Sequence, residues 1–311
     1  MRAVVITKPG DVDVLEVADI SAHEPQEGEV RIAVKAAAVN PTDIGFRQRG
    51  GGDDLPQPWI PGMDAAGVVE SLGPGVDRLA VGQEVMAAVT PRRPDGGAQQ
   101  ELLVVPAASV VAIPDGASLP EAGTLPMNGL TAQSGLDMLD LSSGDTLAVA
   151  GGAGLLGSYV IVLAKERGLR VIADAKPEDE ELVKGFGADV VVPRSEAFGD
   201  AVRAVAPDGV DAVFDTALLY RDVFPAIRDG GQVVFVRGWD GKEVEDRGIQ
   251  VHPVMVGRVL ERTDWLDELR ELASEGRIKL RVATELPPEQ AAEAHRLMDA
   301  GGLRGRAVIV F

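Results

Sequence analysis

A glycine-rich segment near the middle of the chain has the residue types and spacing to bind phosphate. The segment reads Gly152-Ala153-Gly154-Leu155-Leu156-Gly157. Its three glycines follow the pattern G-x-G-x-x-G, between an apolar run typical of a buried strand and an apolar stretch typical of a helix. In that setting the first glycine permits a tight turn, the second lets backbone approach a pyrophosphate, and the third lets helix and strand pack closely. Because a helix N-terminus also attracts phosphate, we expect this segment to bind a dinucleotide.

Charged residues after the next two strands bear on which dinucleotide binds. Asp174 and Lys176 follow the second strand of this region, and Arg194 follows the third. An acidic residue there usually binds the ribose 2′-hydroxyl of NAD, whereas a cation accommodates the 2′-phosphate of NADP. Asp174 thus favours NADH, while Lys176 and Arg194 favour NADPH unless they are solvated loop charges. These residues therefore point in opposite directions and leave the choice between NADPH and NADH open.

The elements that would hold these residues change character along the chain. In the first third, short strands alternate with glycine- and proline-rich turns, and the alternation of Val30 and Ile32 with polar residues is typical of a half-buried strand. Near Ser118, which begins a capping-box pattern, the predicted secondary structure changes to alternating strands and helices. Apolar strands separated by helices predict a parallel sheet covered on both faces. After about residue 254 two helices and a final strand follow, and that strand has no local partner.

Composition narrows the class of protein. A chain of 311 residues suits two modules. Its formal net charge of −19 argues against nucleic acid and anionic membranes as partners. The lack of cysteine excludes disulfides, thiol nucleophiles and cysteine-ligated zinc. The sequence shows neither a signal-peptide pattern nor an apolar run long enough to span a membrane, so we expect a cytoplasmic protein.

Several further segments occur in an order that is far more specific than one motif. They are Val39-Asn40-Pro41-Thr42-Asp43, Ile60-Pro61-Gly62-Met63-Asp64-Ala65-Ala66-Gly67-Val68-Val69-Glu70, Gly73-Pro74-Gly75-Val76, Val81-Gly82-Gln83-Glu84-Val85, Gly97-Ala98-Gln99-Gln100-Glu101, Leu125-Pro126-Met127-Asn128-Gly129-Leu130-Thr131-Ala132, Gly187-Ala188-Asp189 and Gly302-Leu303-Arg304-Gly305-Arg306-Ala307-Val308. Over essentially its whole length the chain resembles the medium-chain dehydrogenase/reductase superfamily, specifically its zinc-independent quinone oxidoreductase (zeta-crystallin-like) branch.

This resemblance implies an α/β protein of two domains. A β-rich, GroES-like catalytic domain would comprise residues 1–117 and 254–311, and an inserted Rossmann domain would comprise residues 118–253. The changes in predicted secondary structure near residues 118 and 254 agree with these boundaries. The resemblance also implies that the final strand joins the catalytic domain, and that the protein forms a homodimer or homotetramer.

The resemblance assigns two polar residues to the active site. Asn40 matches the family's active-site asparagine and is expected to contact the substrate or the nicotinamide ribose. Thr131 matches the family threonine that lies beside the cofactor. The alternative for Asn40 is a turn residue before a proline, and Asp43 could simply cap the following helix.

The same comparison argues against a metal. In zinc-dependent relatives a cysteine stands in the place of Asn40, and a His-Glu pair in the place of Met63-Asp64. The three histidines, His23, His252 and His295, are scattered, and none has zinc-site spacing. We expect His295 to lie on a helix surface. No zinc is expected.

One departure from the family bears on the reaction. Gly45 stands where the family often carries a tyrosine. Its absence speaks against reduction of 2-enoyl thioesters, in which such a tyrosine protonates the substrate, and suits quinones, which take their proton from solvent. The leading hypothesis is NADPH-dependent reduction of a small quinone or α,β-unsaturated carbonyl, with positioned donors stabilising charge on oxygen. The alternatives are a crystallin-like NADPH-binding protein of low activity and an NAD-linked, zinc-free alcohol dehydrogenase.

Overall fold

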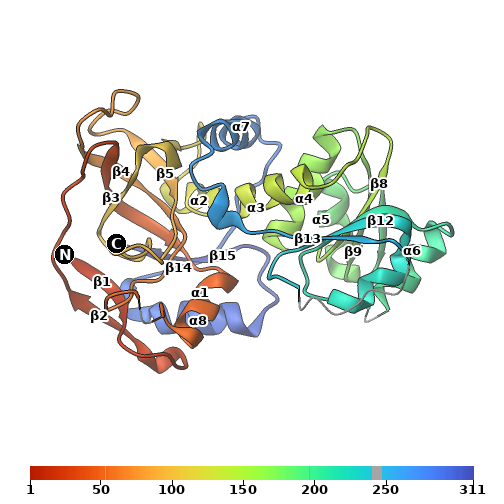
Figure 1. The fold of residues 1–311 in the computed structure, drawn as a ribbon, viewed down its shortest axis with the longest axis horizontal. Helices are drawn as coiled ribbons and strands as arrows, with labels where there is room; N and C mark the ends of the chain where they lie inside the picture. Colours follow the sequence, from red (N-terminus) through yellow and green to blue (C-terminus); the bar gives the residue numbers. More distant parts are fainter. Residues whose placement is uncertain (53, 196, 240–246) are drawn as a thin grey trace. The chain divides into compact units, whose positions relative to one another are not determined.

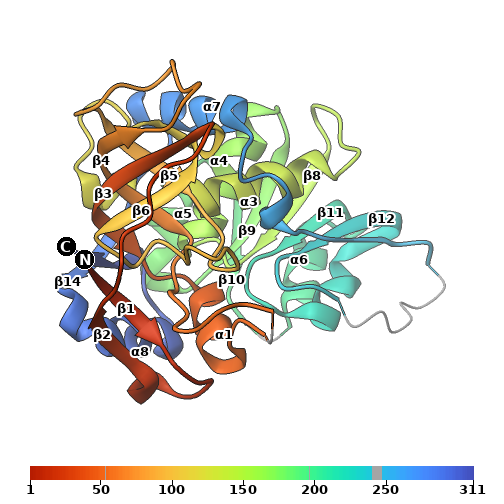
Figure 2. The same ribbon diagram turned by 60° about the vertical axis from the view of Figure 1, so that its left-hand side comes forward.

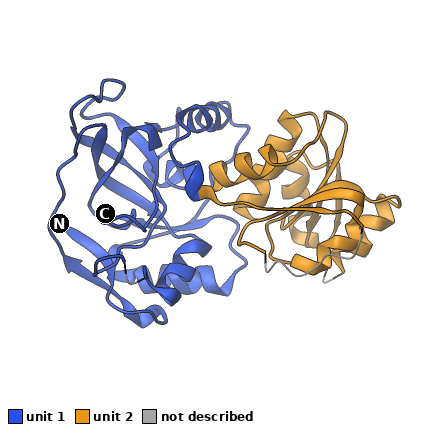
Figure 3. Cartoon of the chain, viewed as in Figure 1, with its two compact units in different colours: residues 1–127, 257–311 blue, residues 128–256 orange. Residues whose placement is uncertain are grey.

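The protein is described from a computed structural model that covers residues 1–52, 54–195, 197–239 and 247–311 (Figure 1). These residues form two compact units, drawn in different colours in Figure 3. Unit 1 comprises Met1–Met127 and Gly257–Phe311, and unit 2 comprises Asn128–Val256. Each unit is described by itself below.

Unit 1 is built on a mainly antiparallel sheet. Its strand order is β14-β15-β3-β4-β5-β7, and β6 also pairs with β3, so that β3, β4, β5 and β6 lie side by side in Figure 2. A separate hairpin is formed by β1 and β2. The strands are β1 (Arg2–Ile6), β2 (Leu15–Asp19), β3 (Glu29–Ala38), β4 (Asp64–Leu72), β5 (Glu84–Ala88), β6 (Leu102–Pro106), β7 (Val110–Ala112), β14 (Val282–Leu286) and β15 (Arg306–Val310).

Alternation along β3 builds the core of this sheet. Val30, Ile32 and Val34 are at most 1% exposed and belong to one apolar cluster. The final strand finds its partners here, because β15 pairs antiparallel with β3 and parallel with β14. Both chain ends therefore contribute to one unit.

The helices of unit 1 cover this sheet and its edges. Within the unit, α1 packs against α8, α2 packs against β3 and β4, and α7 packs against β7. The helices are α1 (Pro41–Arg49), α2 (Leu119–Ala122), α7 (Thr263–Ser274) and α8 (Ala291–Ala300). Ser118 begins α2 with the expected capping box, in which its hydroxyl accepts from the Glu121 N–H. Because α2 packs on β3 and β4, unit 1 extends ten residues beyond the expected boundary at residue 117, to Met127.

Unit 2 contains a six-stranded sheet in which every pairing is parallel. Its order is β10-β9-β8-β11-β12-β13, which is the Rossmann order 3-2-1-4-5-6. The strands are β8 (Thr146–Ala150), β9 (Arg170–Ala175), β10 (Val190–Pro193), β11 (Val210–Asp215), β12 (Ile227–Phe235) and β13 (Gln250–Pro253). The order reverses between β8 and β11, where ligands of such sheets bind at the carboxyl ends of the strands.

Both faces of this sheet are covered. Leu147 and Ala148 point to opposite faces of β8, yet both are 0% exposed. α4 packs on β8 and β9, and α6 packs on β10. The remaining helices are α3 (Pro126–Asp137), α4 (Leu155–Glu166), α5 (Glu180–Gly185) and α6 (Phe198–Val205). Short 3-10 turns are η1 (Val12–Val14), η2 (Ala107–Ser109), η3 (Pro177–Asp179), η4 (Tyr220–Ala226), η5 (Val256–Arg258) and η6 (Pro288–Gln290). The predicted parallel sheet, covered on both faces, is confirmed.

Candidate functional site

The glycine turn joins β8 to α4, and its glycines are needed for different reasons. A Cβ added at Gly157 would lie 2.2 Å from the carbonyl oxygen of Gly151, and one at Gly152 would lie 3.0 Å from the Ala173 Cβ. Both glycines therefore permit close packing. A Cβ at Gly154 would meet only the Gly151 oxygen, at 3.2 Å, and no other atom within 4 Å. Gly154 is the N-cap residue of the 12-residue helix α4 and leaves space before that helix. This geometry fits the pyrophosphate of a dinucleotide.

The other residues of the turn are mostly buried. Leu155 and Ala153 are 1% and 7% exposed, and Leu156 is half-buried. These residues contribute backbone and packing to the turn rather than side-chain chemistry. Thr131 lies in the second turn of α3, within unit 2, and is 6% exposed.

Asp174 lies at the end of β9, as expected, but its contacts differ from those of a ribose ligand. Its side chain is buried, and Oδ1 accepts hydrogen bonds from the N–H groups of Gly151 (2.5 Å) and Gly152 (3.2 Å). Gly151, which the sequence reading left out of the motif, has a φ of +87° that favours glycine. The carboxylate therefore fixes the glycine turn. In the sequence, only the pair of adjacent glycines at positions 151 and 152 could have indicated that the turn bonds this carboxylate.

Lys176 and Arg194 come together at the carboxyl ends of two neighbouring strands. β9 and β10 pair with Ala175 opposite Pro193, and the Arg194 N–H donates to the Ala175 carbonyl (2.8 Å). Nη1 of Arg194 lies 3.7 Å from Asp174 Oδ2. Lys176 is exposed and forms no ion pair with any residue that the structure describes. Two cations thus flank the strand end where a ribose would lie.

Asn40 begins α1 in unit 1, and its side chain is fully buried. Its Nδ2 donates to Asp64 Oδ2 (2.7 Å), and its Oδ1 accepts from Arg306 Nε (2.7 Å). Its backbone N–H donates to Asp43 Oδ2 (2.8 Å), which completes a capping box. Both polar atoms of the side chain are therefore hydrogen-bonded to residues inside unit 1. Asp43 thus caps the helix, which is the alternative role that the sequence analysis gave for it.

Asp43 and Asp64 form the acidic part of this buried network. Gly62 N–H donates to Asp43 Oδ1 (3.1 Å), and Met127 N–H donates to Asp64 Oδ1 (2.6 Å). Burial raises the pKa of each carboxyl to about 7, against the lowering effect of these N–H donors and of Arg306. The charge of Asp64 raises the pKa of Asp43 further. In the sequence, Asp64 and Arg306 stand out only as parts of family motifs, and no pattern predicts this network.

His295 contradicts its expected place on a helix surface. It is 0% exposed, and its Nδ1 lies 3.3 Å from Nη1 of the equally buried Arg47. Burial and the neighbouring Arg47 charge lower the pKa of His295 to about 3, so the ring is neutral. Arg47 also bonds Asp299 (3.0 Å), so the pair links α1 to α8. The expectation failed because buried Arg47, itself bonded to Asp299, gives the ring a polar contact at Nδ1 inside the protein, although Nε2 has no hydrogen-bond partner among the described residues.

In the described ranges, no three His, Cys, Asp or Glu side chains gather as a group that could hold a metal ion. No helix among the described residues has the length and apolarity needed to cross a membrane.

Comparison with known proteins agrees with this architecture. Residues 26–115 match the alcohol dehydrogenase GroES-like domain, and residues 186–309 match the zinc-binding dehydrogenase family. The chain is 32% identical to the chloroplastic NADPH-dependent alkenal/one oxidoreductase of Arabidopsis thaliana, over 99% of this chain and 79% of that protein. The chain belongs to the medium-chain dehydrogenase/reductase family of oxidoreductases.

Two solved structures resemble the whole chain. One, of an NAD-dependent alcohol dehydrogenase, has a TM-score of 0.87 and 31% identity and covers 100% of both chains. The other, of a mycobacterial protein complexed with NADPH, has a TM-score of 0.87 and 27% identity and also covers 100% of both chains. The α/β fold with a GroES-like part and a Rossmann sheet is thereby confirmed.

Proposed function

We propose that this protein uses NADPH to reduce a small quinone or α,β-unsaturated carbonyl, without zinc. The observation that carries the proposal is the open Gly154 position at the N-terminus of α4, next to two cations at the ends of β9 and β10. The alkenal/one oxidoreductase relative supports the substrate class. Bound NADPH would supply the hydride, and the acceptor would take its proton from solvent.

Within this proposal, the units divide the work. Unit 2 would bind the dinucleotide through the turn from Gly152 to Gly157, with Thr131 beside the cofactor. Unit 1 would carry the catalytic residues. Asn40 would contact the substrate or the nicotinamide ribose only by exchanging one of its hydrogen bonds to Asp64 and Arg306, because its side chain is fully buried and both polar atoms are bonded.

Turnover is the direct test of the proposal. Purified protein should oxidise NADPH in the presence of a small quinone or enone, and prior treatment with EDTA should leave the rate unchanged. Tight NADPH binding with no turnover across a broad panel of acceptors would instead favour the crystallin-like alternative. A chelator-sensitive rate would contradict the zinc-free proposal.

Cofactor choice gives a second prediction. Lys176→Ala and Arg194→Ala should each weaken NADPH binding by about 1.5–3 kcal/mol, the free energy of a hydrogen bond to a charged group, while NADH binding changes little. Lys184→Ala is the matched control, because Lys184 is an exposed cation of α5 that pairs with Glu180 and Glu181. Calorimetric titration with both cofactors measures the difference, and equal losses for NADPH and NADH would refute the assigned role.

An NAD-linked alcohol dehydrogenase remains the second candidate. The solved NAD-dependent alcohol dehydrogenase that resembles this chain supports it. The contacts of Asp174 favour NADPH instead. Its Oδ1 is bonded to the glycine turn, so this oxygen is not available to the ribose 2′-hydroxyl of NAD. Oxidation of simple alcohols with NAD, at rates above those of enone reduction, would favour this candidate.

We also propose that the protein is cytoplasmic and forms a homodimer or homotetramer. Light scattering of the purified protein tests the oligomeric state.

A further inference from the structure

We propose that Gln99 binds the carbonyl oxygen of the acceptor, with its side-chain Nε2 as the hydrogen-bond donor. The proposal rests on the proposed function, because it assigns a further substrate-binding residue to the same reaction. Gln99 would favour acceptors that present an oxygen to its amide over hydrocarbons of the same shape. It lies in unit 1, in the loop that leads into β6.

The Gln99 side chain is buried without a hydrogen-bond partner. It is 0% exposed, and neither Oε1 nor Nε2 has a partner among the residues that the structure describes. Its backbone, by contrast, is fully bonded, since the N–H donates to the Pro61 carbonyl (3.0 Å) and the carbonyl accepts from the Val4 N–H (2.9 Å). An amide that is removed from water without a partner costs free energy. A ligand oxygen that accepts from Nε2 would offset that cost.

Two nearby residues show that burial alone does not leave an amide unpaired. Gln100 is 1% exposed, and its Nε2 donates to the carbonyls of Asp95 (2.9 Å) and Gly97 (2.8 Å). Asn40 is also buried, and both polar atoms of its side chain are bonded. Of these three buried amides, Gln99 is the one that can bond a ligand without first breaking a bond within the protein.

Gln99 lies beside the buried network of Asn40. The N–H of Ala98, the preceding residue, donates to the Gly62 carbonyl (3.0 Å). A Cβ built on Gly62 would lie 2.9 Å from the Gln99 nitrogen, so the two backbone segments are in contact. Gly62 also donates its own N–H to Asp43, which caps α1 at Asn40. Gln99 is therefore next to the residues that the proposed function places at the reaction.

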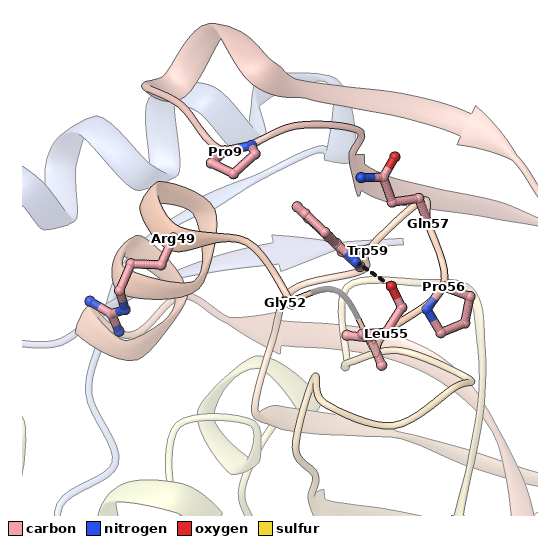
Figure 4. Close-up of a pocket in the computed structure, with 7 residues that line it drawn as sticks. All are labelled: Pro9, Arg49, Gly52, Leu55, Pro56, Gln57 and Trp59. Carbon is pink, nitrogen blue, oxygen red and sulfur yellow. Dashed lines mark hydrogen bonds between the residues drawn. The ribbon is translucent and has the colours of Figure 1, made fainter.

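Further contacts hold the backbone of this region in place. Val4 of β1 bonds the Gln99 carbonyl, and Ile6 of the same strand exchanges two backbone hydrogen bonds with Trp59. The indole N–H of Trp59 donates to the Leu55 carbonyl (3.0 Å), as the dashed line in Figure 4 shows. β1 thus ties together the two segments that meet at Gln99. Its amide is carried by a fixed backbone, as a preorganised donor requires.

The chemistry of reduction gives this donor a defined role. When hydride from NADPH adds to the β-carbon of an enone, the electron pair of the C=C bond shifts and negative charge develops on the carbonyl oxygen. Nε2 would donate to that oxygen and stabilise the enolate, whose α-carbon then takes a proton from solvent. Burial strengthens such a bond because no water competes for it. Since the carboxamide is covered, an acceptor reaches it by displacing a covering side chain, and the unbranched Met63, next to Gly62, is of a flexible type that can move.

The experiment replaces glutamine with methionine, which is similar in length and has no amide. Gln99→Met should raise the midpoint of urea unfolding, because it removes an unpaired buried amide, and yet lower kcat/KM for benzalacetone by about 10- to 100-fold. The Kd of benzalacetone, measured by calorimetry with NADP⁺ present so that no reduction occurs, should rise about tenfold. The Kd of phenylbutene, the hydrocarbon with the same carbon skeleton and no oxygen, should stay the same.

Gln100→Met is the matched control. It removes an equally buried amide that is bonded within the protein, so it should lower the urea midpoint. It should leave kcat/KM and the Kd of both ligands unchanged.

The outcomes separate this proposal from the proposed function. Turnover of benzalacetone with no difference between wild type and Gln99→Met would overturn the role of Gln99 and leave the reductase intact. Binding of benzalacetone that depends on Gln99, with no turnover by wild type, would support the role and contradict the reductase. A lowered urea midpoint in Gln99→Met would show that the amide already has a partner, and equal losses of affinity for both ligands would show a change of shape. Either result would also overturn the role.

Discussion

Alanine at Gly157 is expected to destabilise unit 2 by about 1–3 kcal/mol or more, whereas alanine at Gly154 is expected to cost less than about 1 kcal/mol. At position 157 the new Cβ would lie 2.2 Å from the Gly151 carbonyl oxygen and 2.9 Å from its carbon, and backbone atoms cannot turn aside. α4 would have to move away from β8. At position 154 the nearest atom is 3.2 Å away, and the φ of −67° suits alanine.

NADPH binding is expected to follow a different order. The methyl group of Gly154→Ala would occupy the space that a pyrophosphate needs, so the Kd for NADPH should rise at least 100-fold, or about 2.7 kcal/mol. Urea unfolding measures the stability of each full-length variant, and calorimetry measures NADPH binding. Unchanged NADPH affinity in Gly154→Ala would mean that the turn is only a tight strand–helix connection, and the dinucleotide site would have to be sought elsewhere.

The close packing at Gly157 could be predicted from sequence because it depends on neighbours in the chain. The close approach at Gly157 involves Gly151, six residues earlier, and both lie in one strand–turn–helix unit. The side-chain direction of Asp174 could not be predicted in this way. It lies at the expected strand end, but only the paired strands β8 and β9 bring its carboxylate under the turn. Sequence position located the residue, and tertiary pairing decided its contact.

Contacts between distant segments account for the larger omissions. Asn40, Asp64 and Arg306 meet because β15 pairs with the end of β3 and β4 pairs with the same strand. No periodicity in the sequence encodes that register. His295 was misplaced for the same reason, since its buried partner Arg47 belongs to a helix at the other end of the chain. The family resemblance pointed to Asn40, but it did not indicate the ionisable partners that surround it.

Those partners predict an unusual pH dependence of stability. The pKa values of Asp43 and Asp64 are about 7 in the folded protein, raised by burial from the ordinary carboxyl value of 3.8. Between pH 3.8 and about pH 7 the folded state retains protons on these carboxyls that the unfolded state releases. The free energy of unfolding should therefore fall as pH rises, by about 1.4 kcal/mol per pH unit for each carboxyl, and become level above pH about 7.

Asp43→Asn should remove one of the two contributions. An amide keeps one acceptor for the N–H groups of Asn40 and Gly62, and the loss of the other shifts stability by a constant amount. The informative quantity is thus the slope, which urea unfolding between about pH 4.5 and 7 measures in wild type and variant. The difference between their free energies of unfolding should change by about 1.4 kcal/mol per pH unit in favour of Asp43→Asn as pH rises. It should stay constant above about pH 8, which is the internal control. Parallel curves over the whole range would show that the buried Asp43 is ionised in the folded protein, and the network would then be an ion pair to Arg306 rather than a proton store.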